Sequence, residues 1–207
     1  MNVLLINGSP HEKGCTHTAL TIVSDILQQE KFQTTFFWIG DKNIHGCIHC
    51  NECQKNHQCA HNPFINEVIS LATYADGFIF GSPVHYAAPS GHLTSFMDCL
   101  FYAAPKDVFA LKPASAVVSA RRAGTTAALD QIHKYFSLSQ MPIITSPYWN
   151  MVHGNTPAEV LKDEEGVYVM KTLGRNMAYF LKCIMAGKLA GLPNPKKEDP
   201  KRTNFIR

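Results

Sequence analysis

The sequence predicts an α/β protein with one doubly wound parallel sheet. Five short runs of apolar and β-branched residues recur along the chain, and each ends in residues typical of turns. Between most of these runs, apolar residues repeat every three to four positions, as they do on the buried side of a helix. The first run is apolar throughout, which is typical of a strand buried on both faces. Strands that alternate with helices in this way form right-handed crossovers and a parallel sheet covered on both sides.

The first strand is predicted at Asn2–Asn7, where a Gly-Ser-Pro turn closes the apolar run. The helix that follows carries apolar residues at helical spacing from Ala19 to Leu27, and Thr16 or Thr18 is expected to cap its start. The other strands are predicted at residues 33–39, 76–82, 113–119 and 142–146. Further helical patterns cover residues 93–101, 127–136 and 167–184.

A single domain is expected at residues 1–187, followed by a basic tail at residues 188–207. The tail holds six of the 19 Lys and Arg residues, so the rest of the chain is nearly neutral and no nucleic-acid partner is expected. The sequence has no apolar stretch of the roughly 18 residues that a membrane span needs, and its start lacks the features of an export signal. We therefore expect a cytoplasmic protein that has no membrane partner. Its seven cysteines then favour reduced thiols, metal ligation or redox chemistry.

The loop after the first strand, residues 8–18, has the composition of a phosphate site. It contains neither the G-x-G-x-x-G fingerprint nor a Walker loop. Ser9, Thr16 and Thr18 offer hydroxyl groups, and the start of the next helix offers free N–H groups and the positive end of its dipole. These donors suit a phosphate monoester. A helix with ordinary Ser or Thr capping is the alternative.

The loops after the third and fourth strands favour a ligand with a flat ring. Residues 81–86 and 119–124 are rich in Gly, aromatic and hydrogen-bonding residues. In a doubly wound sheet the ligand lies beyond the carboxyl ends of the strands, so these loops and the first one are expected to meet there. Glycine permits a close approach of the backbone, while Tyr86 and the Arg guanidinium groups can stack on a planar heterocycle.

Five segments carry a family resemblance: GSPHEKGCTHTAL (8–20), CIHCNECQKNHQC (47–59), DGFIFGSPVHYAAPSGHLTSFMD (76–98), SARRAG (119–124) and YWNMVHG (148–154). In this order they resemble the flavodoxin-like NAD(P)H-dependent FMN reductases, and among them the iron–sulfur flavoproteins. The resemblance implies a five-stranded parallel sheet in the order 2-1-3-4-5 within a three-layer α/β/α fold. It also implies bound FMN, NADH or NADPH as co-substrate, and a homodimer or homotetramer.

The resemblance also implies roles for particular residues. The phosphate would be held by Ser9, Thr16, His17 and Thr18, the isoalloxazine would lie beside Pro83, Val84, His85 and Tyr86, and its other edge would meet Ser119, Arg122 and Gly124. The sequence departs from the family at two cysteines. Cys15 stands where Asn is usual, and Cys99 stands where Arg is usual, so neither is given a role.

Four cysteines lie within a Cys-rich loop at residues 45–62. Cys47, Cys50, Cys53 and Cys59 have the spacing C-x2-C-x2-C-x5-C, and the first three match the compact part of a bacterial ferredoxin motif. A [4Fe–4S] cluster, which the resemblance supports, is one interpretation. The histidines between these thiols suit a zinc site, and a reduced loop without metal is the third interpretation.

Tyr148, Trp149, Asn150 and His153 follow the fifth predicted strand, where they would form the substrate side of the site or a dimer interface. The expected activity is FMN-dependent NAD(P)H oxidoreduction, in which the flavin carries the chemistry and no catalytic side chain is needed. The electron acceptor would be a small molecule: a quinone, a free flavin, a nitro or azo compound, or a metal ion. Two alternatives remain, which are an iron–sulfur flavoprotein that acts as an electron carrier and a Cys/His metal-binding module.

Overall fold

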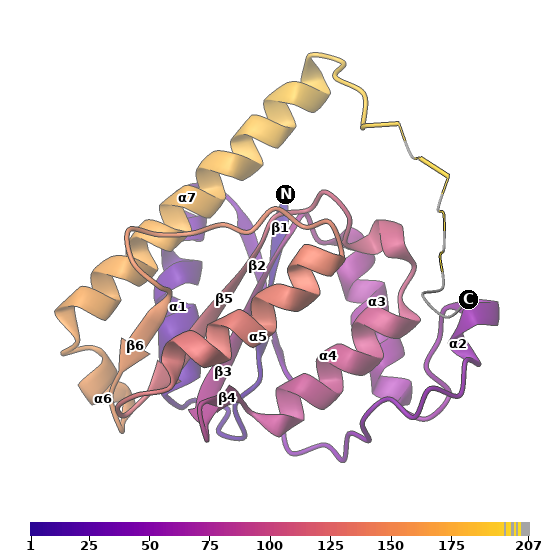
Figure 1. Ribbon diagram of the computed structural model, residues 1–207. Coiled ribbons are helices and arrows are strands. Elements are labelled where there is room, and N and C mark those ends of the chain that lie inside the picture. Colours follow the sequence, from indigo (N-terminus) through magenta and orange to yellow (C-terminus); the bar gives the residue numbers. More distant parts are fainter. Residues whose placement is uncertain (197, 200, 202, 204–207) are drawn as a thin grey trace.

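The computed structural model describes residues 1–196, 198, 199, 201 and 203 as a three-layer α/β/α fold (Figure 1). Within these residues, the strands that run parallel are β1 (Asn2–Asn7), β2 (Gln33–Trp38), β3 (Gly77–His85), β5 (Ala114–Ala120) and β6 (Met151–His153). Their order in the sheet is β2-β1-β3-β5-β6. The short β4 (Ala88–Pro89) turns back and pairs antiparallel with the end of β3. The predicted fold class and strand order are confirmed.

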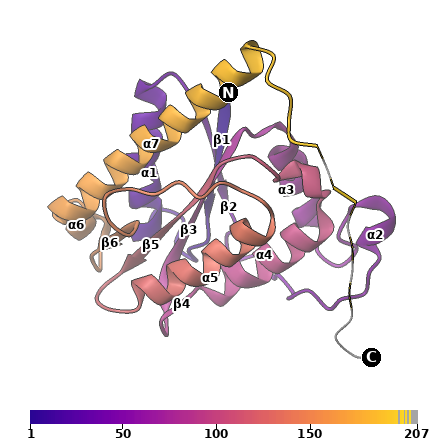
Figure 2. The same cartoon turned by 45° about the horizontal axis from the view of Figure 1, so that its top comes forward.

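Helices cover both faces of the sheet (Figures 1 and 2). One face carries α1 (Cys15–Gln29) and α7 (Glu164–Leu189), which pack on each other. The other face carries α3 (Pro63–Tyr74), α4 (Gly91–Ala103) and α5 (Thr125–Leu138). The short helical segments are α2 (Cys53–Asn56), the 3-10 turn η1 (Lys106–Val108) and α6 (Pro157–Val160). No helix in the described part of the chain has the length and hydrophobicity of a membrane span.

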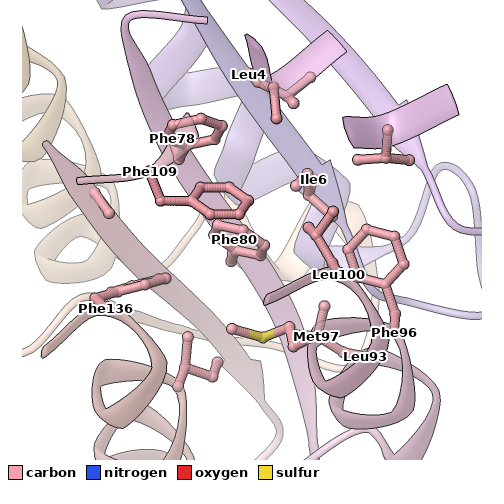
Figure 3. Close-up of a cluster of buried hydrophobic side chains, with 14 of the residues drawn as sticks. Leu4, Ile6, Phe78, Phe80, Leu93, Phe96, Met97, Leu100, Phe109 and Phe136 are labelled. Atoms are coloured by element: carbon pink, nitrogen blue, oxygen red, sulfur yellow. The ribbon is translucent and has the colours of Figure 1, made fainter. Parts of the chain in front are cut away.

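Side chains of the sheet alternate between two hydrophobic cores, as the two-residue period of a strand requires. Leu4 and Ile6 of β1 point into the core beneath α3, α4 and α5, whereas Val3 and Leu5 point into the core beneath α1 and α7. The first core is rich in aromatic rings, and Figure 3 shows Phe78, Phe80, Phe109 and Phe136 gathered in it. These two cores fix the strands whose carboxyl ends form the site.

The fifth strand is not where the sequence predicted it. Residues 142–146 contribute one isolated parallel bridge, between Ala114 and Ile143, and the last strand of the sheet is Met151–His153. The Pro142 carbonyl oxygen accepts from the Ala114 N–H, the Ile144 N–H donates to the Ala114 carbonyl oxygen, and the segment then leaves the sheet. The chain returns to β5 at Asn150, whose carbonyl oxygen accepts a hydrogen bond from Val118.

The predicted threonine cap of the first helix is also wrong. Gly14 occupies the N-cap position of α1, with no side-chain cap, and the Thr18 hydroxyl donates to the Gly14 carbonyl oxygen at 3.2 Å. At the other end of the fold, α7 runs to Leu189 and so passes the predicted boundary at residue 187. Of the predicted tail, residues 197, 200, 202 and 204–207 lie outside the described residues.

Candidate functional site

Three neighbouring strand ends are joined by hydrogen bonds at the carboxyl edge of the sheet. Gly8, after β1, donates its N–H to the carbonyl oxygen of Gly81 in β3 at 2.8 Å. The Ser90 hydroxyl, which caps α4, donates to the Gly8 carbonyl oxygen at 2.8 Å. Thr16 in α1 and Ser119 in β5 share a buried hydrogen bond of 2.8 Å between their hydroxyl groups. The loops after β1, β3 and β5 therefore form one continuous edge, as the sequence predicted.

Two glycines allow the backbone to come this close. A Cβ atom on Gly8 would lie 2.8 Å from the Gly81 carbonyl oxygen, and one on Gly81 would lie 2.8 Å from the Thr16 methyl group. Both distances are shorter than van der Waals contact. The start of α1 therefore sits directly on the ends of β1 and β3.

The start of α1 has donors to spare. Among the described residues, the N–H groups of Cys15, Thr16 and His17 have no hydrogen-bond partner, as expected for the first turn of a helix. Ser9 is buried beside them, and its hydroxyl oxygen accepts from the His11 N–H at 3.1 Å, which leaves the hydroxyl proton free to donate. These groups and the positive end of the helix dipole suit a phosphate.

The residues predicted for the phosphate are placed differently from one another. Ser9 and Thr16 are buried at the helix start, and Thr18 is half-buried one turn along α1. The His17 ring packs against the Phe36 ring of β2, with centroids 5.3 Å apart. The structure thus brings the hydroxyl groups of Ser9 and Thr16 to the helix start, whereas the Thr18 hydroxyl donates back to Gly14 and the imidazole of His17 lies on the β2 side.

An open groove of ≈ 550 Å³, in the size range of small-molecule sites, borders the first loop. It is lined by residues 10–15, Trp38 and residues 155–157 and includes none of the residues predicted to contact FMN. The Trp38 indole N–H donates to the Ser9 carbonyl oxygen at 2.8 Å and so braces the loop. Sequence reasoning missed Trp38, although its place at the carboxyl end of the second strand was a usable signal.

The loops after β3 and β5 touch each other. Gly124 has a φ of +99°, and a Cβ atom on it would lie 2.9 Å from the Cα atom of Ala87. Tyr86 is fully exposed at the tip of the β3–β4 hairpin, with a φ of +50°. Pro83 and Val84 are half-buried, while His85 and Arg122 are exposed. Pro83 and Val84 offer a flat ring apolar packing, and the exposed polar and aromatic groups around them offer hydrogen bonds and stacking.

The Cys-rich loop lies against α4 at the periphery of the fold (Figure 1). Cys47, Cys50, Cys53 and Cys59 line one pocket, and Cys99 of α4 lines it with them. Burial raises the pKa of the Cys53 thiol, and the neighbouring Cys47, Cys50 and Cys59 raise it further. Burial also raises the pKa of Cys99 to about 12, with a contribution from Cys59. Five thiols thus surround one small space.

This donor set fits an iron–sulfur cluster in its chemistry. Thiolates are the ligands of [4Fe–4S] clusters, and mutual repulsion of the thiolates would be relieved by bound iron. In the part of the chain that the structure describes, no three His, Cys, Asp or Glu side chains converge closely enough to hold a metal ion, so the fit lies in the chemistry of the donors. The His49 ring is hydrogen bonded to the Tyr102 hydroxyl at 3.0 Å.

Comparison with known proteins decides the family. The sequence profile of the NADPH-dependent FMN reductase family matches residues 1–156. The chain belongs to this family. As a member it is a flavin-binding oxidoreductase, and the cofactor of the family is FMN.

Relatives of this FMN reductase family member carry a more specific name. An iron-sulfur flavoprotein of Methanocaldococcus jannaschii is 29% identical over 194 residues, which cover 89% of this chain and 99% of that protein. A second iron-sulfur flavoprotein of the same organism is 32% identical over 190 residues, which cover 84% and 94%. A flavodoxin from the domain Archaea shares the fold, with a TM-score of 0.59, 14% identity, and coverage of 88% of this chain and 99% of that one.

The residues predicted for the substrate side lie at the β6 edge of the sheet in this member of the family. Tyr148 and Trp149 are half-exposed and pack edge to face, with centroids 4.9 Å apart. His153 lies in β6, with its Nδ1 atom 3.8 Å from an Asp163 carboxylate oxygen. Asn150 is buried, and its amide bonds the hydroxyl groups of Ser115 and Ser146, so this side chain is committed to the fold.

Cys15, which departs from the family pattern, lies in the first turn of α1 and borders the groove. Its thiol points at the Gly154 carbonyl oxygen, 3.7 Å away, and burial raises its pKa. This neutral thiol therefore adds no negative charge beside the proposed phosphate site.

Proposed function

We propose that the protein is an FMN-dependent NAD(P)H oxidoreductase that passes electrons to a small-molecule acceptor. The observation that carries this proposal is the joined edge of β1, β3 and β5 with the free N–H groups of Cys15, Thr16 and His17 at its centre. This arrangement provides hydrogen-bond donors and positive potential for a phosphate, next to two loops that suit a flat ring. The family match supports the same cofactor.

In this proposal the side chains place the cofactor and do not react. The hydroxyl groups of Ser9 and Thr16 and the first-turn N–H groups hold the phosphate, while the Thr18 hydroxyl, which the sequence also pointed to, donates to the Gly14 carbonyl oxygen. The loops at residues 83–86 and 119–124 hold the ring, and the contact of Gly124 with Ala87 fixes their separation. Bound FMN would supply hydride acceptance and one- or two-electron transfer. Steady-state kinetics would distinguish NADH from NADPH. They would also identify the acceptor among quinones, flavins, nitro or azo compounds and metal ions.

Steady-state kinetics test this function. We expect the purified protein, saturated with FMN, to oxidise NADH or NADPH with each acceptor class offered in turn. The protein without FMN is the control. Loss of absorbance at ~340 nm that requires both FMN and the protein supports the proposal. If the FMN-saturated protein oxidises neither nucleotide, the proposed NAD(P)H oxidoreductase activity is contradicted. The electron-carrier function then remains.

A second function is favoured by the five thiols around one pocket. We propose that Cys47, Cys50, Cys53 and Cys59 hold a [4Fe–4S] cluster that exchanges electrons with the flavin, so that the protein acts as an electron carrier. The names of its relatives support this function. Iron and sulfide analysis after anaerobic purification tests it: about four of each per chain is expected. Zinc in place of iron would instead favour the metal-binding module.

The expected homodimer or homotetramer remains a prediction. Light scattering coupled to size-exclusion chromatography measures the mass of the protein in solution. It therefore distinguishes a monomer of 23.0 kDa from a dimer or a tetramer.

A further inference from the structure

The loop that carries the four clustered thiols is closed at its base by one buried side chain. We call residues 46–61 the thiol loop; His45 precedes it and Asn62 follows it. The Asn62 amide oxygen accepts from the His45 N–H at 3.3 Å, and its amide nitrogen donates to the His45 carbonyl oxygen at 3.0 Å. Asn62 is 5% exposed. A single amide therefore holds both ends of the loop together.

Cys99 fixes this closed base to the body of the protein. The Cys99 sulfur accepts from the Asn62 amide nitrogen at 3.2 Å, and its S–H points at the His45 carbonyl oxygen at 3.4 Å. Cys99 is 3% exposed and lies in α4. The cap of that same helix, Ser90, bonds Gly8 in the first loop. One rigid helix thus connects the thiol loop with the edge proposed for FMN.

Outside its base, the thiol loop is attached to the fold at Tyr102 and at Asn66. Its regular structure is the four-residue α2, and His49, Asn51 and His57 have positive φ angles. Most of its side chains are exposed. Besides the base, its described hydrogen bonds to the rest of the fold are made by Tyr102, through His49, Asn51 and Gln54, by the carbonyl of Tyr102 with Cys53, and by Asn66 with Cys59. The base is therefore one of three places where hydrogen bonds hold the loop, beside Tyr102 and Asn66, and it is the one that joins the two ends of the loop.

We propose that Asn62 and Cys99 are positioning residues for the iron–sulfur site: together they hold the thiol loop closed, and Cys99 acts as a hydrogen-bonding thiol and not as an iron ligand. This inference rests on the second proposed function. A cluster needs four sulfur atoms at fixed separations, and a loop with a free base would spend part of its time with the thiols apart. The geometry gives Cys99 two hydrogen-bond partners at the base, whereas the other four thiols belong to the loop that would close around the cluster.

The first test needs no metal. Lys55 is the only Lys or Arg between residues 43 and 62, and it is exposed in α2. Trypsin cleavage after Lys55 in the folded, metal-free protein therefore reports opening of the loop. We expect Asn62→Ala to raise this rate roughly tenfold, because the loop ends lose their bridge. Asn176→Ala, which removes an amide that donates to the Thr145 carbonyl oxygen at 2.7 Å, should leave the rate unchanged.

The second test follows the cluster. We expect Cys99→Ala to lose iron to a chelator several times faster than the wild type and to shift the midpoint potential of the cluster, with FMN content unchanged. Cys99→Ser keeps a donor and an acceptor and should restore most of the retention. Cys183→Ala, which removes an exposed thiol of α7, is the matched control.

The outcomes separate this inference from the function on which it rests. A wild-type protein that assembles no cluster contradicts the second proposed function and this inference together. A wild-type cluster that Asn62→Ala and Cys99→Ala retain with an unchanged potential, with no faster cleavage at Lys55, overturns the inference alone. The inference is also overturned if Cys99→Ser loses iron while Cys59→Ser keeps four irons per chain. Cys99, and not Cys59, would then be the fourth iron ligand.

Discussion

The hydroxyl groups of Thr16 and Ser119 lie 2.8 Å apart, although 103 positions separate the two residues in the sequence. This buried contact joins the first turn of α1 to the end of β5, across β1 and β3. It places a hydroxyl pair beside the free N–H groups that would hold a phosphate. The phosphate end and the ring end of the proposed FMN site are thereby fixed relative to each other.

Thr16→Val tests the phosphate side of this contact. Valine keeps the methyl group that packs on Gly81 but removes the hydroxyl. A hydrogen bond to a charged group contributes about 1.5–3 kcal/mol, so the Kd for FMN should rise roughly ten- to hundredfold. Fluorescence titration of FMN measures it. Thr172→Val, which removes a surface hydroxyl of α7, is the control, and an equal loss of affinity there would argue against a local role.

Gly8→Ala tests the close packing of the strand ends. The new Cβ atom would lie 2.8 Å from the Gly81 carbonyl oxygen and 2.8 Å from the Leu93 Cβ atom, neither of which can move cheaply. Overpacking of this kind costs about 1–3 kcal/mol, which lowers the Tm by several degrees. Gly91→Ala is the matched change, since nothing lies within 4 Å of its Cβ position. Equal melting temperatures for the two variants would show that the edge is looser than described.

We expect the ionisation of the Tyr135 phenol to make the stability of the protein depend on pH. Burial raises the pKa of this phenol, and its hydrogen bond to the Asp98 carboxylate raises it further. The unfolded chain therefore releases this proton at a lower pH than the folded protein, so the contribution of Tyr135 is complete below about pH 10 and falls as the pH rises above it. The Tm of Tyr135→Phe should decline less than that of the wild type between pH 10 and pH 11. Parallel declines would remove this assignment.

Cys50→Ser separates the two proposed cofactor sites. Cys50 belongs to the thiol loop, which lies against α4, whereas the FMN residues lie at the carboxyl edge of the sheet. Iron content and the broad visible absorbance of the cluster should fall to near zero, while FMN binding is retained. Cys183→Ser should change neither. Loss of FMN together with iron would mean that the two sites are one structural unit.

Much of this architecture could be read from the sequence because apolar periodicity and turn residues are local signals. Asn2–Asn7 was predicted with its observed bounds, and the phosphate role of the hydroxyl residues in the first loop, inferred from their place after a buried strand, stays a prediction. The fifth strand was misplaced because Met151–His153 is a three-residue strand with little pattern of its own. Residues 142–146 have the composition of a strand but form only one isolated bridge to β5.

Other parts of the site depend on contacts between distant segments. Asn62 and Cys99 are 37 positions apart, and no spacing rule links an amide after a loop with a thiol in a later helix. In the sequence, Cys99 is notable only as a departure from the family pattern. The role proposed for it comes from its contacts with Asn62 and His45. Trp38 could have been found, because it ends a strand on the ligand edge of the sheet.

The comparison of FMN with riboflavin tests the central claim most directly, because the two differ by the phosphate that the start of α1 is proposed to hold. Equilibrium titration of the wild-type, flavin-free protein should show FMN binding roughly a hundredfold more tightly than riboflavin. Equal affinities for the two flavins, or no binding of either, would contradict the account.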